Sequence, residues 1–340
     1  MPFPQPDTLA DIGALVAAMP GPDGANASAA AQREVRLTKP PGALGRLERL
    51  AQWLATWQGR QPPRVARALV VVFAGSHGVT GQGVSAYPAT VTAQMVRNFE
   101  AGGAAINQIC RAVGAELRVV DLAETPTRDF TQGPAMDEAA CAAAVAAGMA
   151  AVEDGIDLLA VGEMGIGNTA AAAAICHALF GGEAADWTGP GTGVAGAALA
   201  RKVAAVAEGV AVNRTALGDP LQVLRCLGGR EIAAMTGAIL AARLGRVPVL
   251  LDGYVTGAAA SVLHALDPGA LDHCVAAHCS AEPAHRRLLE KLGQEPLLDL
   301  GMRLGEATGA ALAIALVRAA AECHTGMATF AEAGVADKDE

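Results

Sequence analysis

Aromatic residues are scarce in this chain: Phe, Trp and Tyr together make up 3% of its 340 residues. Packing must therefore rely on Ala, Val, Leu and Ile, which suit close contacts between helices and sheets. Charged residues are also few, at 17%, whereas hydrophobic residues reach 52%. Such a composition can bury a large core. The length allows either two domains or one large α/β domain with an appendage.

The chain also lacks any concentration of positive charge. Its formal net charge is −9, and its basic residues are scattered along the sequence. A protein that binds nucleic acid would usually carry a basic stripe, and an anionic membrane would repel an acidic surface. We therefore expect neither nucleic acid nor membrane among the partners. A phosphorylated small molecule is not excluded, because it needs only a local cluster of donors.

The seven cysteines show no disulfide pattern, since their number is odd and no C-x-x-C motif occurs. Reduced thiols and a cytoplasmic location are the simplest interpretation. The segment 273–279 contains two His and two Cys. Alternate side chains of such a short apolar segment face opposite ways, so we expect buried core cysteines there and no metal site.

Neither a signal peptide nor a membrane span is expected. The first basic residue is Arg33, and Asp11 interrupts the only apolar stretch that precedes it. The longest uncharged apolar runs, 141–152 and 307–317, are too short to cross a bilayer and are typical of buried helices.

Short apolar segments alternate with helical ones along the chain. The expected strands are 68–74, 117–122, 156–161, 247–251 and 272–277. The expected helices are 8–19, 45–57, 92–111, 137–154, 168–180, 201–213, 231–244, 256–266 and 283–292, with a last one after Glu306. Because the strands show little alternation between apolar and polar residues, both faces of the sheet should be covered.

The predicted fold class is therefore α/β, with a mostly parallel sheet, helices on both faces in a Rossmann-like three-layer arrangement, and a smaller helical domain. We expect residues 62–300 to form the α/β core. Residues 1–61 and 301–340 are expected to pack together as the smaller, mostly helical domain.

A glycine-rich turn, Gly162 to Thr169, follows the third expected strand and opens an Ala-rich helix. Glycine lets a backbone approach a ligand closely, and free N–H groups at a helix start suit a phosphate. Asn168 or Thr169 could cap this helix. The spacing G-x-x-G-x-G matches neither the dinucleotide fingerprint nor a Walker loop. The alternative is a tight turn without a ligand.

Polar residues or glycines follow the other strands as well. The Gly189–Gly193 cluster precedes Lys202, which could supply a charge to a phosphate or could be a solvated surface residue. His77 follows the first strand and is interpreted as ordering its loop. Asp252 ends the fourth strand, and Ser280 could cap a helix or bind a phosphate. Because the carboxyl ends of parallel strands meet at one edge, these loops predict a ligand site.

Glu306 is the only charged residue between Arg303 and Arg318. An apolar pocket would raise the pKa of its carboxyl toward neutrality, as a general base for a weakly acidic N–H requires. The alternative is a helix-start Glu that points to water and favours the helix dipole. Tyr87 and Met95 could line a pocket for an aromatic ligand, or could simply pack in the core.

Together these segments resemble the nicotinate-nucleotide:dimethylbenzimidazole phosphoribosyltransferase family. The resemblance runs from Lys39-Pro40-Pro41-Gly42 to residues 329–335, and its shared stretches include 162–169, 250–254, 280–282 and 302–313. It implies transfer of the phosphoribosyl group of nicotinate mononucleotide to 5,6-dimethylbenzimidazole, with inversion at C1′, for assembly of the cobalamin nucleotide. It also implies a homodimer and no cofactor.

By the same resemblance, Glu306 is the catalytic base and Glu163 could stabilise an oxocarbenium-like transition state. Glu163 and Met164 would lie beside the ribose and the acceptor. The other residues implied in substrate binding are Gly165, Lys202 and Ser280 at the 5′-phosphate, Tyr87 and Met95 at the acceptor, and Leu304 and Asp252.

Three alternatives remain open at this point. The acceptor could be adenine, another benzimidazole or a phenol, since each of these transfers also needs one base. A non-catalytic nucleotide-binding protein would keep the glycine loops and Lys202 but would not need Glu306. A nicotinamide-dependent dehydrogenase is disfavoured, because no G-x-G-x-x-G follows the first strand.

Overall fold

The structure is a computed structural model that describes residues 4–336. At its centre lies a five-stranded sheet in the order β2-β1-β3-β4-β5, and every neighbouring pair is parallel. The strands are β1 (Ala68–Gly75), β2 (Glu116–Leu122), β3 (Leu158–Met164), β4 (Val249–Leu251) and β5 (Cys274–Ala276). The predicted parallel α/β fold is confirmed. Strand β3 extends further than expected, so Glu163 and Met164 end the strand itself.

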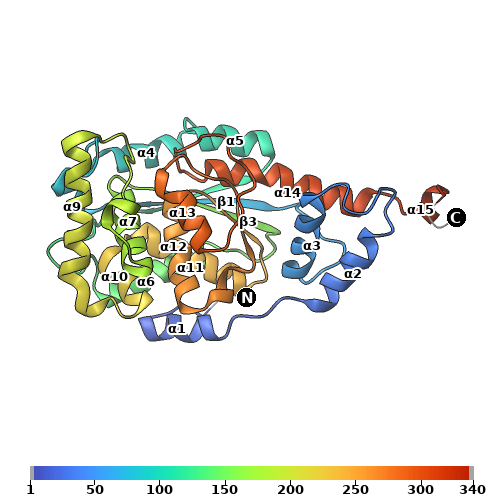
Figure 1. Ribbon diagram of the computed structural model, residues 1–340, viewed down its shortest axis with the longest axis horizontal. Helices are drawn as coiled ribbons and strands as arrows, with labels where there is room; N and C mark the ends of the chain where they lie inside the picture. Colours follow the sequence, from blue (N-terminus) through green and yellow to red (C-terminus); the bar gives the residue numbers. More distant parts are fainter. Residues whose placement is uncertain (1–3, 337–340) are drawn as a thin grey trace.

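Helices cover both faces of this sheet. On one face lie α1 (Leu9–Ala17), α6 (Glu138–Ala150), α7 (Asn168–Phe180), α8 (Ala184–Trp187), α9 (Gly196–Asn213), α10 (Pro220–Leu227), α11 (Arg230–Leu244), α12 (Tyr254–Leu266) and α13 (Pro283–Lys291). On the other face lie α3 (Arg46–Gln58), α4 (Val91–Glu100), α5 (Ala105–Val113) and α14 (Thr308–Gly326). Figure 1 shows α5 and α14 above the strands and α11 and α12 below them.

Alternate side chains of β1 enter two separate cores. Leu69, Val71 and Phe73 pack with the α6–α11–α12 side. Val70 and Val72 pack with the α3–α5–α14 side. Since both faces of the strand are buried, its sequence can be apolar throughout, as the lack of alternation predicted.

The prediction of one helix over 92–111 is wrong. Helix α4 ends at Glu100 and α5 begins at Ala105. Between them Gly102 has φ +77°, and a Cβ at Gly103 would lie under 3.0 Å from the Asn98 side chain. The two glycines therefore turn the chain, because left-handed backbone is inexpensive only for glycine.

Helix α2 (Gly24–Glu34) and helix α10 were not predicted at all. The α10 segment does carry a start signal, since Asp219 accepts a hydrogen bond from the Leu221 N–H and Pro220 occupies the first helical position. Helix α2 has a polar, Ala-rich sequence with little apolar periodicity. Its N-cap Asp23, which accepts from the Asn26 N–H, is the one local signal that was available.

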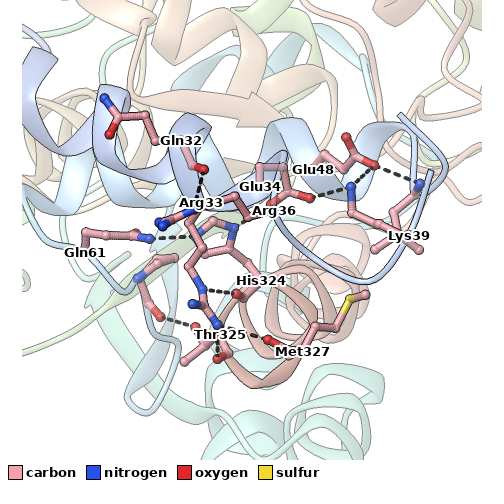
Figure 2. Close-up of polar contacts among 12 residues, drawn as sticks. Gln32, Arg33, Glu34, Arg36, Lys39, Glu48, Gln61, His324, Thr325 and Met327 are labelled. Carbon is pink, nitrogen blue, oxygen red and sulfur yellow. Dashed lines mark hydrogen bonds and ion pairs between the residues drawn. The ribbon is translucent and has the colours of Figure 1, made fainter. Parts of the chain in front are cut away.

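Helices α2 and α3 meet the end of α14 at one end of the molecule, where a polar network joins them (Figure 2). Lys39 Nζ lies 3.0 Å from Glu34 Oε1 and 2.7 Å from Glu48 Oε1. His324 Nδ1 lies 2.5 Å from Glu34 Oε2, and its Nε2 lies 2.7 Å from the amide of Gln61. We call Glu34, Lys39, Glu48 and His324 the Glu34 cluster.

The proposed division at residues 61/62 and 300/301 stays a prediction. Helix α1 buries Leu9, Ile12 and Val16 in the same core as α6 and α12, whereas α3 packs against α14. Between residues 4 and 336, no helix is both long enough and apolar enough to cross a membrane.

Candidate active site

A pocket of about 500 Å³ lies where the strands β3, β4 and β5 end at their carboxyl edge. Its walls come from the segments after these strands, from α4 and from the loop that precedes α14. The predicted residues that line it are Tyr87, Met95, Glu163, Met164, Gly165, Ser280, Leu304 and Glu306. Lys202 and Asp252 do not line it; both lie in the layer behind.

The loop 305–307 is seated on the end of β3. The Glu306 N–H donates to the Glu163 carbonyl at 3.1 Å. A Cβ at Gly305 would lie under 3.0 Å from Glu163 Oε1, and one at Gly162 would overlap the Ala307 backbone. Only glycine allows this approach, so two carboxylates that are far apart in the sequence, Glu163 and Glu306, share one wall of the pocket.

This loop has an unusual backbone. Glu306 and Ala307 have φ values of 60° and 59°, after Gly305 at 80°. A left-handed conformation costs a non-glycine residue about 1–2 kcal/mol. Two such residues in succession, directly before α14, indicate that the surrounding contacts hold Glu306 in place against its local preference.

The Glu306 side chain is 5% exposed, and its Oε2 has no hydrogen-bond partner among residues 4–336. Burial and, to a lesser extent, the charge of Asp252 raise the pKa of its carboxyl to about 7. The side chain therefore does not point to open water, as the helix-dipole alternative required. It can gain or lose a proton near neutral pH.

Glu163 is the second carboxylate of the pocket. Burial, then the charges of Glu231, Asp252 and Glu306, raise its pKa to about 8, against a hydrogen bond from Asn168 that lowers it. The Asn168 side-chain amide donates to Glu163 Oε2. In the free protein this carboxyl thus carries a proton over part of the neutral range, and a positive charge placed in the pocket would favour its anion.

The glycine turn opens α7 without the predicted cap. Gly167 is the N-cap residue, and no side chain caps the helix. Asn168 turns to Glu163, and the Thr169 hydroxyl accepts from Lys202 Nζ at 2.8 Å. The two expected capping side chains are used to hold neighbouring groups. The N–H groups of Asn168 and Ala170 donate to the Gly165 and Gly167 carbonyls instead, at 3.2 and 3.0 Å.

Lys202 is fully buried behind this turn. Its Nζ donates to Thr169 Oγ1 and, at 2.9 Å, to the Gly189 carbonyl. Burial lowers its pKa to about 8, and the charge of Glu282 opposes that shift. The solvated-surface alternative is therefore wrong. The side chain fastens the Gly189–Gly193 loop to α7.

Asp252 directly follows β4 and holds the start of α14. Its Oδ1 accepts from the Ala310 N–H at 2.9 Å and lies 3.5 Å from His278 Nε2. His278 itself lines the pocket. Neither of its ring nitrogens has a hydrogen-bond partner within the described part of the chain. Asp252 thus acts on the pocket through Glu306 and His278.

The mouth of the pocket is formed by three loops that hold one another. Thr192 Oγ1 lies 2.9 Å from Ser85 Oγ, beside Tyr87. Arg303 donates to the Gly191 carbonyl at 3.0 Å. Tyr87 and Leu304 are each 56% exposed at this mouth. The apolar groups at the rim suit a flat aromatic ligand, which both Met95 and Met164 could contact from within.

Sequence reasoning missed several residues here. His278 and Arg303 line the pocket, yet they were not predicted as site residues. Arg303 stands in the same short motif as Glu306, so its position in the sequence could have indicated that it lies at the site. Buried Glu231, at the start of α11, was not considered, because only the fold brings it under the glycine turn.

Comparison with known proteins agrees with this geometry. The sequence model of the family described as Phosphoribosyltransferase matches residues 19–335. A nicotinate-nucleotide–dimethylbenzimidazole phosphoribosyltransferase from Brucella canis is 61% identical over 326 residues, which are 96% of each chain. The chain belongs to this phosphoribosyltransferase family.

Two further relatives of this phosphoribosyltransferase extend the finding. The protein of the same name from Sinorhizobium medicae is 62% identical over 329 residues, 96% of this chain and 97% of that protein. The crystal structure of CobT from Thermus thermophilus superposes with a TM-score of 0.86 at 45% identity, covering 92% of this chain and 99% of that one. The resemblance and the fold expected from the sequence are thereby confirmed.

Proposed function

We propose that this phosphoribosyltransferase transfers the 5-phosphoribosyl group of nicotinate mononucleotide to 5,6-dimethylbenzimidazole, giving α-ribazole 5′-phosphate and nicotinate. The names of its relatives support these substrates. The observation that carries the proposal is Glu306, a buried carboxylate whose pKa is raised to about 7, on the wall of a pocket that also presents Met95 and Tyr87.

The reaction needs one base. The donor nitrogen is a quaternary pyridinium, so the C1′–N bond breaks with its electron pair going to that nitrogen, and no acid is required. The acceptor nitrogen forms the new bond to C1′ from the opposite face, which inverts that carbon. The proton on the other azole nitrogen then becomes acidic, and Glu306 takes it. A base with a pKa near the working pH is suited to this step.

The neighbouring carboxylates suit the charge that develops on the ribose. Glu163 would face the oxocarbenium-like centre, and its anion is favoured once a cationic donor is bound. Gly165 and Ser280 would hold the 5′-phosphate. Lys202 would support them from behind Thr169 through its charge and its hold on the Gly189–Gly193 loop.

The remaining predicted residues fit the acceptor and the framework. Met164, Met95, Tyr87 and Leu304 would contact the aromatic ring, since all four line the pocket. Asp252 would keep Glu306 in position by anchoring α14. Variation of these apolar contacts would change which ring fits, so a panel of adenine, other benzimidazoles and phenols tests the acceptor.

We also infer a homodimer in the cytoplasm. The exposed Tyr87 and Leu304 at the rim offer apolar surface for a second copy. Six of the seven cysteines are buried as free thiols, which fits a reducing compartment. Light scattering during gel filtration would measure the mass in solution, and a mass of about 34 kDa, the size of one chain, would contradict the dimer.

Glu306→Gln tests the mechanism. Loss of a general base should lower kcat by about 10²–10⁴-fold. Donor binding, measured by calorimetry, should stay within a few-fold, because the phosphate and ribose contacts remain. Glu322→Gln is the matched control, since Glu322 lies exposed on α14. Near-normal turnover in Glu306→Gln would contradict the role of Glu306. Donor binding without transfer to any acceptor in the unmodified protein would favour the non-catalytic alternative.

A further inference from the structure

A buried histidine–carboxylate pair lies under the pocket without lining it. His77 follows β1, Glu231 lies in the first turn of α11, and the side chains are 1% and 0% exposed. His77 Nε2 is 2.5 Å from Glu231 Oε1. The pair is too deep to touch a substrate, so any part it takes in the reaction must pass through other residues.

The surrounding backbone is shaped around this pair. A Cβ at Gly75 would lie under 3.0 Å from the Glu231 carboxylate. A Cβ at Gly229 would lie under 3.0 Å from both Glu231 and the His77 ring. Glycines therefore make room for the pair on β1 and at the start of α11. The backbone beside the pair therefore carries glycine at the two positions where any larger residue would collide with the His77 or Glu231 side chain.

The pair supports the glycine turn from beneath. A Cβ at Gly165 would lie 3.2 Å from Glu231 Oε1 and 3.2 Å from the Asn168 amide. A Cβ at Gly167 would lie 3.3 Å from the His77 Cβ. The turn thus rests on both partners, and it delivers Asn168, whose amide donates to Glu163 Oε2. A continuous set of contacts leads from the pair to the carboxylate in the pocket.

The pair is incompletely satisfied. His77 Nδ1 and Glu231 Oε2 are buried without a hydrogen-bond partner among residues 4–336. A half-satisfied buried polar pair costs stability, so packing alone does not account for it. From this geometry we propose that His77 and Glu231 are positioning residues: they fix the glycine turn and Asn168, and through them the orientation and the charge state of Glu163. This inference rests on the proposed function.

The electrostatics point the same way. The groups that act on Glu163 are Glu231 on α11, Asp252 after β4, Glu306 before α14 and Asn168 on α7. His77 contacts Glu231, and His278 lies 3.5 Å from Asp252. After burial, the Glu231 charge contributes most to raising the pKa of Glu163. Removing that charge lowers the pKa of Glu163, so its anion persists to lower pH.

Glu231→Gln keeps the shape of the side chain and removes its charge. We expect kcat on the pH plateau to fall by about 10- to 100-fold, because the turn and Asn168 lose their fixed support. The acid limb of kcat/KM should move to lower pH. Titration of the Glu163 side-chain ¹³C signal, identified with Glu163→Gln, should show the same shift without any substrate. A purely structural role would lower the melting temperature and leave both titrations unchanged.

Glu34→Gln is the matched control. Glu34 also lies 2.5 Å from a buried histidine, His324, but belongs to the cluster at the helical end (Figure 2). The Glu34→Gln variant should be less stable than the unmodified protein, while its kcat and its pH profile stay the same. If Glu231→Gln behaves as Glu34→Gln does, with Glu163 titrating at the unmodified pH, the proposal is overturned.

His77→Gln covers the case in which Glu231→Gln does not fold. The His77→Gln variant should show faster amide hydrogen exchange at residues 165–169 and a lower kcat. Unchanged exchange at these residues would overturn the proposal. The proposed function fails separately, if the unmodified protein transfers ribose phosphate to no acceptor. The carbon titration and the exchange experiment still decide the role of the pair, since neither needs turnover.

Discussion

Two regions of this protein bury charged side chains, and they do so in opposite ways. In the Glu34 cluster, Lys39 lies between two carboxylates, and His324 contacts one of them (Figure 2). Burial alone would lower the pKa of Lys39, but hydrogen bonds to Glu48 and Glu34 raise it above its ordinary value. Each carboxylate here has a cationic partner.

At the pocket four carboxylates lie close together: Glu163 and Glu306 in its wall, and Glu231 and Asp252 behind them. The pKa of Glu163 is raised to about 8 and that of Glu306 to about 7, first by burial. Oxygen atoms of Glu231 and Glu306, and both ring nitrogens of His278, have no hydrogen-bond partner between residues 4 and 336.

This comparison distinguishes buried charged groups that stabilise the fold from buried charged groups that serve to bind a ligand. A satisfied cluster can hold helices together. An unsatisfied one costs folding free energy and is kept where a ligand brings the missing partner. In the proposed reaction the cationic donor supplies a positive charge, and the azole acceptor supplies a hydrogen-bond donor. We therefore expect changes in the two regions to alter stability with opposite signs.

Lys39→Met should have the largest effect on stability. It leaves the two partly buried carboxylates of the Glu34 cluster facing each other, and loss of one partner of a buried pair costs up to about 3–5 kcal/mol. Urea unfolding measures that loss, while kcat should stay near normal. Lys291→Met, at an exposed lysine of α13, is the control. If Lys39→Met unfolds at the same urea concentration as the unmodified protein, the Glu34 cluster does not contribute to the free energy of unfolding.

Glu306→Gln should act in the opposite direction. The folded pKa of about 7 lies above the ordinary 4.5, so the unfolded chain ionises first and stability falls as pH rises between these values. The variant does not lose this stability as the pH rises, and the loss amounts to at most about 3.5 kcal/mol, for a shift of about 2.5 pKa units at about 1.4 kcal/mol each. Urea unfolding at pH 8 should show the gain, and at pH 4.5 the two proteins should agree. A loss of stability at pH 8 would mean that the Glu306 anion is well satisfied in the folded state.

The pH dependence of turnover should report the two raised carboxyls. Both Glu163 and Glu306 must be ionised for the proposed reaction. kcat/KM should therefore fall about tenfold from pH 8 to pH 7 and more steeply below, as each required ionisation contributes a factor of ten per unit. Initial rates at saturating acceptor measure this profile. A flat profile between pH 6 and pH 8 would exclude these carboxyls as essential anions.

Arg286→Ala should have the smallest effect and sets the baseline for both regions. Arg286 and Asp299 form an ion pair at 2.7 Å, but their side chains are 63% and 58% exposed. Solvent screens such a pair, so we expect no measurable change in the free energy of unfolding. A larger change by urea unfolding would mean that the effects in the buried regions cannot be assigned to burial alone.

The sequence predicted those parts of the fold that depend on local pattern. Strand β1 ends one residue beyond its predicted end, and α7 spans the predicted residues, because apolar runs and helix boundaries are encoded within a few positions. The break between α4 and α5 was missed, since glycine signals there were outweighed by helical periodicity on either side. Glu306 was recognised because it stands alone in an apolar segment.

Contacts between distant segments could not be predicted in the same way. Lys202 looked like a surface residue in sequence, yet the packing of α9 on α7 buries it completely. His77 and Glu231 are separated by two strands, and nothing local pairs them. The sequence alone determined the parallel α/β fold, the glycine turn and a solitary carboxylate, because each depends on neighbouring residues. Only the tertiary structure decided which charges are satisfied, because burial and pairing depend on which segments the sheet brings together.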